Sequence, residues 1–400
     1  MAKSINVASW RKNTHEEMLA YFEDKKQAHE EPRKKKRSSF LVVRSRLRPF
    51  DVYSYLRAKF GVPNGLQNLL RKDDSDNWIH WDFNLKADDV DVYIVGTSRD
   101  IHFMISEKLT DEDWKALIIG MKADFGRIGQ AKKQMAQSFE KYLVFQNKYV
   151  TLAEICAEMH ASITDAPAKQ TALPEITSKR SMKRYSAEIK ELSKRATDLY
   201  GDCLKLRLIT PIMAEAFINM IILTFCKDEI RNDPAAYDAF IRLKLPERLA
   251  ALSENCDGFV SAIDQTTSVY SDFKRVMDKR NFAIHGNVDP VREQIETVYF
   301  EGKRPIFFDG GDNILKLFDH LETINSPTQV IADYEAVHLF LVEILENLSE
   351  RHRQFFMHVI EDPFPGYEVH KKRVNKILPN HNMRALLPRL RYDDDLKVTW

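Results

Sequence analysis

The chain has 400 residues, of which 44% are hydrophobic and 30% are charged, with 60 Lys and Arg against 59 Asp and Glu. This length predicts two or three domains, and the apolar fraction is sufficient for hydrophobic cores. A formal net charge of +1 with 10% aromatic residues excludes a wholly disordered, self-repelling chain, and the low Gly and Pro content excludes a collagen-like one. Near-neutrality also excludes a global electrostatic preference for nucleic acid, so any such partner must bind a local patch.

The cysteine spacing and the apolar segments indicate the cellular compartment. The four cysteines are far apart and include no Cys-x-x-Cys pair, which argues against a zinc ribbon or a disulfide scaffold and is typical of a reducing compartment. The first ten residues contain no apolar run of signal-peptide length. The most hydrophobic stretch, Ile212 to Cys226, is shorter than the roughly 20 residues that span a bilayer. We therefore expect a cytoplasmic protein with no membrane partner.

The N-terminal part predicts a short helix and then an α+β domain. Residues 1–37 contain the expected helix 15–31 and the basic run 33–37, which is either a nucleic-acid contact or import signal, or a solvated connector. Residues 38–160 are the expected α+β domain with a trailing helix. Its expected strands are 39–43, 78–83, 91–95 and 101–105, and its expected helices are 114–125, which Thr110 caps, and 130–160.

The C-terminal part predicts a run of helices after a linker. Residues 161–180 are small and polar with two prolines, so we place the main domain boundary there. Residues 181–360 form the expected helical domain, and residues 361–400 the tail. The expected helices are 182–208, 211–227 with Pro211 in its first turn, 233–245, 246–255 and the long final helix 327–360, and a β-hairpin is inserted at 297–308.

Three residues near the end of an expected helix carry a chemical pattern: Arg280, Asn281 and His285, spaced Arg-Asn-x-x-x-His. An Arg and a His five residues apart on helical backbone lie within about a turn and a half of each other, so both can act on one phosphate. Arg supplies a planar, permanently charged donor, and His exchanges a proton near neutral pH. The Arg-x4-His spacing alone is expected by chance, and Arg353 with His358 repeats it. The adjacent Asn makes the first pair informative.

The motif, preceded by several helices that include an apolar one with an embedded acid, resembles the HEPN superfamily (higher eukaryotes and prokaryotes nucleotide-binding). The resemblance covers roughly residues 181–360. It implies a helical bundle in which Arg280, Asn281 and His285 are the active-site residues. It also implies RNA cleavage by the 2′-hydroxyl without metal or cofactor, leaving a cyclic phosphate, and a homodimer whose two motifs face one composite site. The N-terminal domain and the hairpin lie outside the family core, and residues 1–160 resemble no family that we can name.

The implied chemistry is consistent with these residue types. Attack by a 2′-hydroxyl needs a base for its proton, an acid for the leaving 5′-oxygen and a cation for the charged phosphorane. One Arg and one His per chain supply half of these groups, and two chains supply all of them. The need for a 2′-hydroxyl confines such an activity to RNA. The alternative is structural: Arg280 and His285 cap a helix and pair with neighbouring carboxylates.

Other polar residues support the site. Glu215 and Asn219 are four residues apart on the apolar helix and therefore share a face. Because an unpaired carboxylate among apolar side chains is costly, we expect Glu215 to orient Arg280 across the bundle, with a partner elsewhere as the alternative. Three cations before the motif are candidates for binding RNA phosphates or, alternatively, form a solvated helix face: Lys274, Arg275 and Lys279.

The N-terminal domain contains two further groups of candidates, each with a structural alternative. Aromatic residues that either stack on bases or belong to the core are Trp78, His80 and Trp81. Acids that either bind a metal or form a turn before a strand are Asp88, Asp89 and Asp91.

Together these observations predict an α+β N-terminal domain followed by a mainly α-helical HEPN-like bundle with a small β-hairpin insertion. The leading hypothesis is a hydrolase, an endoribonuclease of HEPN type. By the resemblance, it acts as a toxin or antiviral-defence effector that a trigger ligand or protein controls through the N-terminal domain. The alternative is a non-catalytic interaction protein whose bundle dimerises and whose N-terminal domain binds a ligand. A third hypothesis is a DNA-directed regulator that uses residues 33–37.

Overall fold

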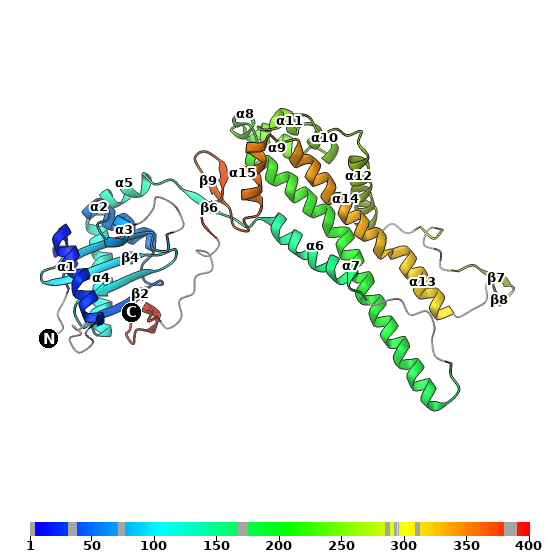
Figure 1. Ribbon diagram of the computed structural model, residues 1–400, viewed down its shortest axis with the longest axis horizontal. Helices are drawn as coiled ribbons and strands as arrows, with labels where there is room; N and C mark the ends of the chain where they lie inside the picture. The colour runs from blue at the N-terminus through cyan, green and yellow to red at the C-terminus, as the bar shows by residue number, and fades with distance from the viewer. Residues whose placement is uncertain are drawn as a thin grey trace. The chain divides into compact units, whose positions relative to one another are not determined.

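The computed structural model describes residues 5–30, 38–70, 77–166, 175–284, 289–291, 294, 296–308, 313–379 and 390–400. The chain divides into two compact units, unit 1 (Met1–Lys141 with Ile377–Trp400) and unit 2 (Tyr142–Lys376). Unit 1 contains an antiparallel sheet with helices, and unit 2 is mostly helical (Figure 1). This is the coarse architecture that the sequence predicts. The basic run 33–37 lies outside the described residues.

Unit 1 is built on a five-stranded antiparallel sheet with the strand order β1-β3-β4-β5-β2. Its strands are β1 (Arg11–Lys12), β2 (Ser39–Val43), β3 (Trp81–Ala87), β4 (Val90–Gly96) and β5 (Ile101–Ile105). Period-2 alternation places Leu41, Phe103, Ile94 and Phe83 side by side on one buried face. That face packs in one core with side chains of α2 (Pro49–Phe60) and α4 (Asp111–Arg127).

Shorter elements complete unit 1. They are the 3₁₀ turn η1 (Val7–Ser9), α1 (His15–Glu30), α3 (Leu66–Leu70), α5 (Gly129–Gln137) and the 3₁₀ turn η3 (Asp393–Asp395). Thr110 caps α4 by accepting a hydrogen bond from the Asp113 amide at 3.2 Å, as expected. The third strand runs over residues 81–87 rather than 78–83, because it pairs with β4 through a tight turn in which Asp88 has a φ of 52°.

The C-terminal tail belongs to unit 1, which its sequence did not predict. The buried Asp393 carboxylate accepts hydrogen bonds from the backbone N–H groups of Arg44, Ser45 and Arg46, the last at 2.7 Å. Leu396 is buried in the same core as the sheet. A carboxylate paired with several main-chain donors and an adjacent apolar anchor hold the tail in place.

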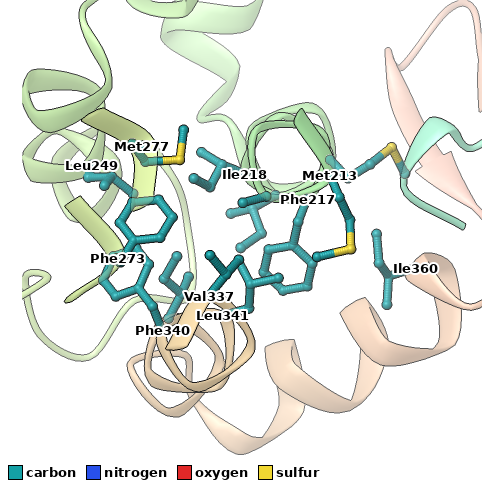
Figure 2. Packing of buried hydrophobic residues seen from close by; sticks show 14 of the residues in the cluster. Met213, Phe217, Ile218, Leu249, Phe273, Met277, Val337, Phe340, Leu341 and Ile360 are labelled. Atoms are coloured by element: carbon teal, nitrogen blue, oxygen red, sulfur yellow. The ribbon is translucent and has the colours of Figure 1, made fainter. Parts of the chain in front are cut away.

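Unit 2 is a helical assembly around one core. Its longer helices are α6 (Lys148–Thr164), α7 (Lys179–Phe225), α12 (Ser268–Ile284), α13 (Asn313–Asn325), α14 (Pro327–Glu346) and α15 (Glu350–Ile360). Its shorter ones are α8 (Asp228–Arg231), α9 (Pro234–Ile241), α10 (Leu245–Ala250) and α11 (Leu252–Asn255). Phe217 of α7, Phe273 of α12 and Phe340 of α14 meet in the core, the last two stacked with their ring centroids 4.2 Å apart (Figure 2).

Two small sheets belong to unit 2. The expected hairpin is present as β7 (Val298–Glu301) and β8 (Arg304–Phe307), and Gly302 takes the positive φ of 62° that its turn requires. A three-stranded sheet joins β6 (Tyr142–Val144), β9 (Gly366–Glu368) and β10 (Arg373–Asn375). The predicted helix 130–160 is wrong over its middle, because β6 pairs there with a strand more than 200 residues later.

The unit boundary falls earlier than the expected linker 161–180. Helix α6 packs against α7 through Cys156, Met159 and Ile163, whose helical spacing forms one apolar face. It therefore belongs to unit 2 instead of trailing the N-terminal domain. Residues 167–174 of the expected linker lie outside the described residues.

Helix α7 is continuous where two helices were expected. It runs for 47 residues with Pro211 inside it. Such a proline costs about 3 kcal/mol, whereas burying one large apolar side chain contributes about 1.5–3 kcal/mol. Leu206, Met213 and Phe217 are all buried on either side of the proline, so tertiary packing outweighs the local break.

The expected long helix 327–360 is interrupted at residues 347–349. The Val260 N–H donates to the Asn347 carbonyl and the Ser349 N–H donates to the Gly258 carbonyl, both at 2.8 Å. Backbone groups of residues 258 and 260 therefore bond groups that a continuous helix would use internally.

Helix α7 is also the one helix among the described residues that is long and apolar enough to span a membrane. That test depends on length and composition alone, and 61% of the most apolar 18-residue window is buried inside the structure. Most of this window therefore belongs to the core of unit 2. The sequence prediction that the apolar stretch is too short to span a bilayer applied to residues 212–226 only, whereas α7 begins at Lys179.

Candidate functional site

The motif lies at the end of α12, whose pattern determines which side chains are buried. Tyr270, Phe273 and Met277 recur at helical spacing and are all at most 6% exposed. The Thr267 hydroxyl accepts a hydrogen bond from the Tyr270 N–H at 3.1 Å near the start of the helix. Arg280 follows Met277 by three residues and therefore lies on the same side of the helix.

Arg280 is held by the acid that the sequence analysis paired with it. Its Nη2 donates to Glu215 Oε1 of α7 at 2.7 Å. The Arg280 side chain is 18% exposed and the Glu215 side chain 32%, so the pair is partly shielded from water. Arg280 Nε is buried and has no hydrogen-bond partner among the described residues. The contact is present, whereas the catalytic role of either residue stays a prediction.

A cavity of about 360 Å³ adjoins this pair. Glu215, Arg280 and Asn281 line it together with Lys274. The apolar part of its wall consists of Leu245, Pro246, Leu249, Tyr270, Phe273 and Met277. Asn281 is exposed, so its amide is free to contact a bound molecule. A concave apolar surface with a few charged groups is the usual form of a small-ligand site.

Arg248 lines the same cavity, although no pattern in the sequence indicates it. Its side chain is 8% exposed, and its Nη1 donates to Asn219 Oδ1 at 3.2 Å and to the Ile241 carbonyl at 3.0 Å. Burial lowers the pKa of Arg248, an effect that the Glu215 charge opposes. The related sequence feature is Asn219, one turn after Glu215, but its partner is defined only by the fold.

The three cations before the motif are divided between two faces of α12. Arg275 Nη1 and Lys279 Nζ each donate to an oxygen of buried Asp333 of α14 at 2.7 Å. Burial acts to raise the pKa of Asp333, but hydrogen bonds from Lys279, Arg275 and Gln329 outweigh it, and the pKa lies below its ordinary value. Of the three cations, only Lys274 lines the cavity.

The remaining motif residues have different outcomes. His285 follows the last residue of α12 and lies outside the described residues. The second Arg-x4-His pair is on α15, where Arg353 forms an ion pair with Glu350 and His358 is exposed. This second pair therefore forms a polar cluster on the surface of α15.

The N-terminal candidates are explained by their local structure. Trp81 packs against Tyr53 with ring centroids 5.4 Å apart, so it is part of the aromatic packing of unit 1. Trp78 is 41% exposed, and His80 Nε2 lies 3.0 Å from Ser98 Oγ. Asp88 and Asp89 form the β3–β4 turn. Among the described residues, no group of three or more His, Cys, Asp or Glu could hold a metal ion.

Comparisons with protein-family models, with curated proteins and with solved structures found no match. The function is therefore argued from the site itself.

Proposed function

We propose that unit 2 is a HEPN-type, metal-independent endoribonuclease domain that cleaves RNA by attack of a ribose 2′-hydroxyl on the adjacent phosphate. The observation that carries the proposal is the pairing of Arg280 with Glu215 at the wall of the cavity, with Asn281 beside it. A guanidinium fixed by one carboxylate oxygen keeps further N–H groups for a phosphate.

Each residue of the motif has a distinct role in this reaction. The 2′-oxygen forms a bond to phosphorus and loses its proton to a base, while the bond from phosphorus to the 5′-oxygen breaks and that oxygen gains a proton. Arg280 stabilises the negative charge of the phosphorane, and His285 serves in proton transfer. Asn281 hydrogen-bonds the substrate without changing charge. Glu215 is a positioning residue that orients Arg280.

The complete reaction needs both a base and an acid, and each chain has one such histidine in the motif. We propose a homodimer through unit 2, in which the second copy supplies the second His285. In this account the protein is a cytoplasmic toxin or antiviral-defence effector, and unit 1 responds to a trigger ligand or protein.

Cleavage of RNA by the purified chain, with a metal chelator present, tests this function. We expect Arg280→Ala and His285→Ala each to reduce the cleavage rate by about 100-fold or more, because each removes a group that acts in the transition state. The double variant Arg353→Ala with His358→Ala is the matched control, because it removes the same residue types at the same spacing away from the cavity. Cleavage that survives both motif substitutions contradicts the proposal.

A further inference from the structure

Arg248 is a buried cation that contacts no carboxylate among the described residues. The Glu215 charge acts on it, but Glu215 is already hydrogen-bonded to Arg280. Arg248 is 8% exposed, its described partners are an amide oxygen and a backbone carbonyl, and it forms no ion pair with a described residue. Its Nε is buried and has no hydrogen-bond partner in the part of the chain that the structure describes. Removing a guanidinium from water is costly unless an anion compensates for it. The site therefore has the properties of an anion-binding position whose ligand comes from outside the chain.

The charges around the cavity indicate the same ligand class. Among the lining residues, four are cationic and two are anionic, which leaves an excess of two positive charges: Lys244, Arg248, Lys274 and Arg280 against Glu215 and Asp278. Glu215 is already engaged by Arg280. Guanidinium and ammonium groups bind phosphates and carboxylates, and phosphate is the one of these two anions that RNA carries.

The rest of the wall is apolar and suits the other part of a nucleotide. Leu245 and Pro246 of α10, which are not buried, line it together with Tyr270 and Met277 of α12. The cavity volume of about 360 Å³ lies in the range of ligand sites of roughly 300–1,000 Å³ and is sufficient for a single nucleotide.

We propose that this cavity is a nucleotide subsite, in which Arg248 binds the phosphate next to the scissile one and the apolar wall receives the base. This inference rests on the proposed nuclease function and specifies its substrate: RNA that is unpaired at the cleavage position. A base in a duplex must first leave its stack and its partner before it can enter such a cavity. Lys274, exposed at the rim, adds a second phosphate contact.

Fluorescence anisotropy with a labelled, fully 2′-O-methylated oligonucleotide tests the subsite, because this strand cannot undergo attack by a 2′-hydroxyl. We expect Arg248→Met to weaken binding of the single strand by about tenfold, since a charge-assisted contact is lost, and Lys274→Gln to weaken it by a few-fold. Arg242→Met is the matched control, because Arg242 is exposed six residues earlier and pairs with Asp238. The same strand annealed to its complement is expected to bind at least about tenfold more weakly.

The subsite is overturned if Arg248→Met and Lys274→Gln bind like the wild type, or if the duplex binds as tightly as the single strand. Thermal unfolding checks the Arg248 variant, which also loses its contact with Asn219. If that variant does not fold, the binding measured for Lys274→Gln and for the duplex tests the subsite instead.

Cleavage assays on the same variants separate this inference from the nuclease. If Arg248→Met cleaves and binds RNA like the wild type, the subsite is contradicted and the nuclease function is retained. If the wild type cleaves no RNA but binds it, and Arg248→Met weakens that binding, the nuclease function is contradicted and the subsite is retained.

Discussion

At the scale of single residues, one turn of α7 holds two arginines beside the cavity. Glu215 bonds Arg280 of α12, and Asn219 bonds Arg248 of α10. The sequence predicted the first contact because an acid in an apolar helix needs a partner. It could not predict the second, because an amide has many acceptable partners and only the packing of α10 brings Arg248 to it.

Glu215→Gln tests the positioning role. The amide oxygen still accepts a hydrogen bond, but the charge that fixes Arg280 is lost. We expect kcat for RNA cleavage to fall by about tenfold with KM changed little, and the free energy of unfolding to fall by about 1 kcal/mol. Glu188→Gln on the same helix, which loses an exposed ion pair with Arg184, serves as the control with unchanged kcat. A kcat for Glu215→Gln equal to that of the wild type would contradict the positioning role of Glu215.

Asp333 of α14 is a buried acid that forms ion pairs with two cations of α12. Replacing it with Asn leaves Arg275 and Lys279 without their buried counter-charge. Because the two cations are partly exposed and stay solvated in the variant, we expect a loss of about 1–2 kcal/mol, which urea unfolding at neutral pH measures.

The pH dependence of this cost follows from the lowered pKa of Asp333. The stabilisation is fully present above the ordinary carboxyl pKa and is lost as the pH falls through the lowered value. The difference between the wild type and Asp333→Asn should therefore shrink in acid. A difference that grows in acid contradicts the ion-pair account.

At the scale of elements, the sequence patterns were most reliable where local signals and burial agreed. The Thr110 cap, the strands at 91–95 and 101–105 and the hairpin around Gly302 are present as predicted. Pro211 shows the opposite case, because a strong local break is overridden by the core. Strand β6 has no local signal that distinguishes it from a helix, since its pairing partner β9 is distant in the sequence.

Gly258 is the backbone position on which the break between α14 and α15 depends. It has a φ of +90°, and a Cβ there would lie 2.4 Å from the His352 ring. We expect Gly258→Ala to reduce the free energy of unfolding by at least about 2 kcal/mol, from the left-handed backbone and the steric overlap.

Gly201 provides the matched comparison for Gly258. It lies inside α7, where no atom lies within 4 Å of an added Cβ, so Gly201→Ala should stabilise by about 1 kcal/mol. Urea unfolding measures both variants. Equal effects at the two positions contradict the proposed role of Gly258.

At the scale of the whole molecule, both ends of the sequence contribute to unit 1. The division into a sheet-containing part and a helical part follows from the sequence patterns, whereas the return of residues 390–400 to unit 1 does not. That return depends on Asp393 meeting the amides of residues 44–46. A pattern within a few residues contains no information about a partner almost 350 residues away.

Asp393→Ala tests whether the tail is an integral part of unit 1. The variant loses a buried acceptor of several main-chain N–H groups, so we expect a loss of about 3 kcal/mol. Hydrogen exchange locates the effect: the amides of residues 44–46 should exchange faster, while those of α7 and α14 in unit 2 should not change. Unchanged exchange at residues 44–46 contradicts this account of the tail.

The chemical identity of the RNA ends tests the central claim most directly. The purified chain is incubated with RNA in the presence of a metal chelator, and the products are analysed by mass spectrometry. Attack by the 2′-hydroxyl predicts 2′,3′-cyclic phosphate and 5′-hydroxyl ends, which disappear with Arg280→Ala and persist in the Arg353→Ala, His358→Ala control. Ends with a 3′-hydroxyl and a 5′-phosphate, or cleavage that the chelator abolishes, would contradict it.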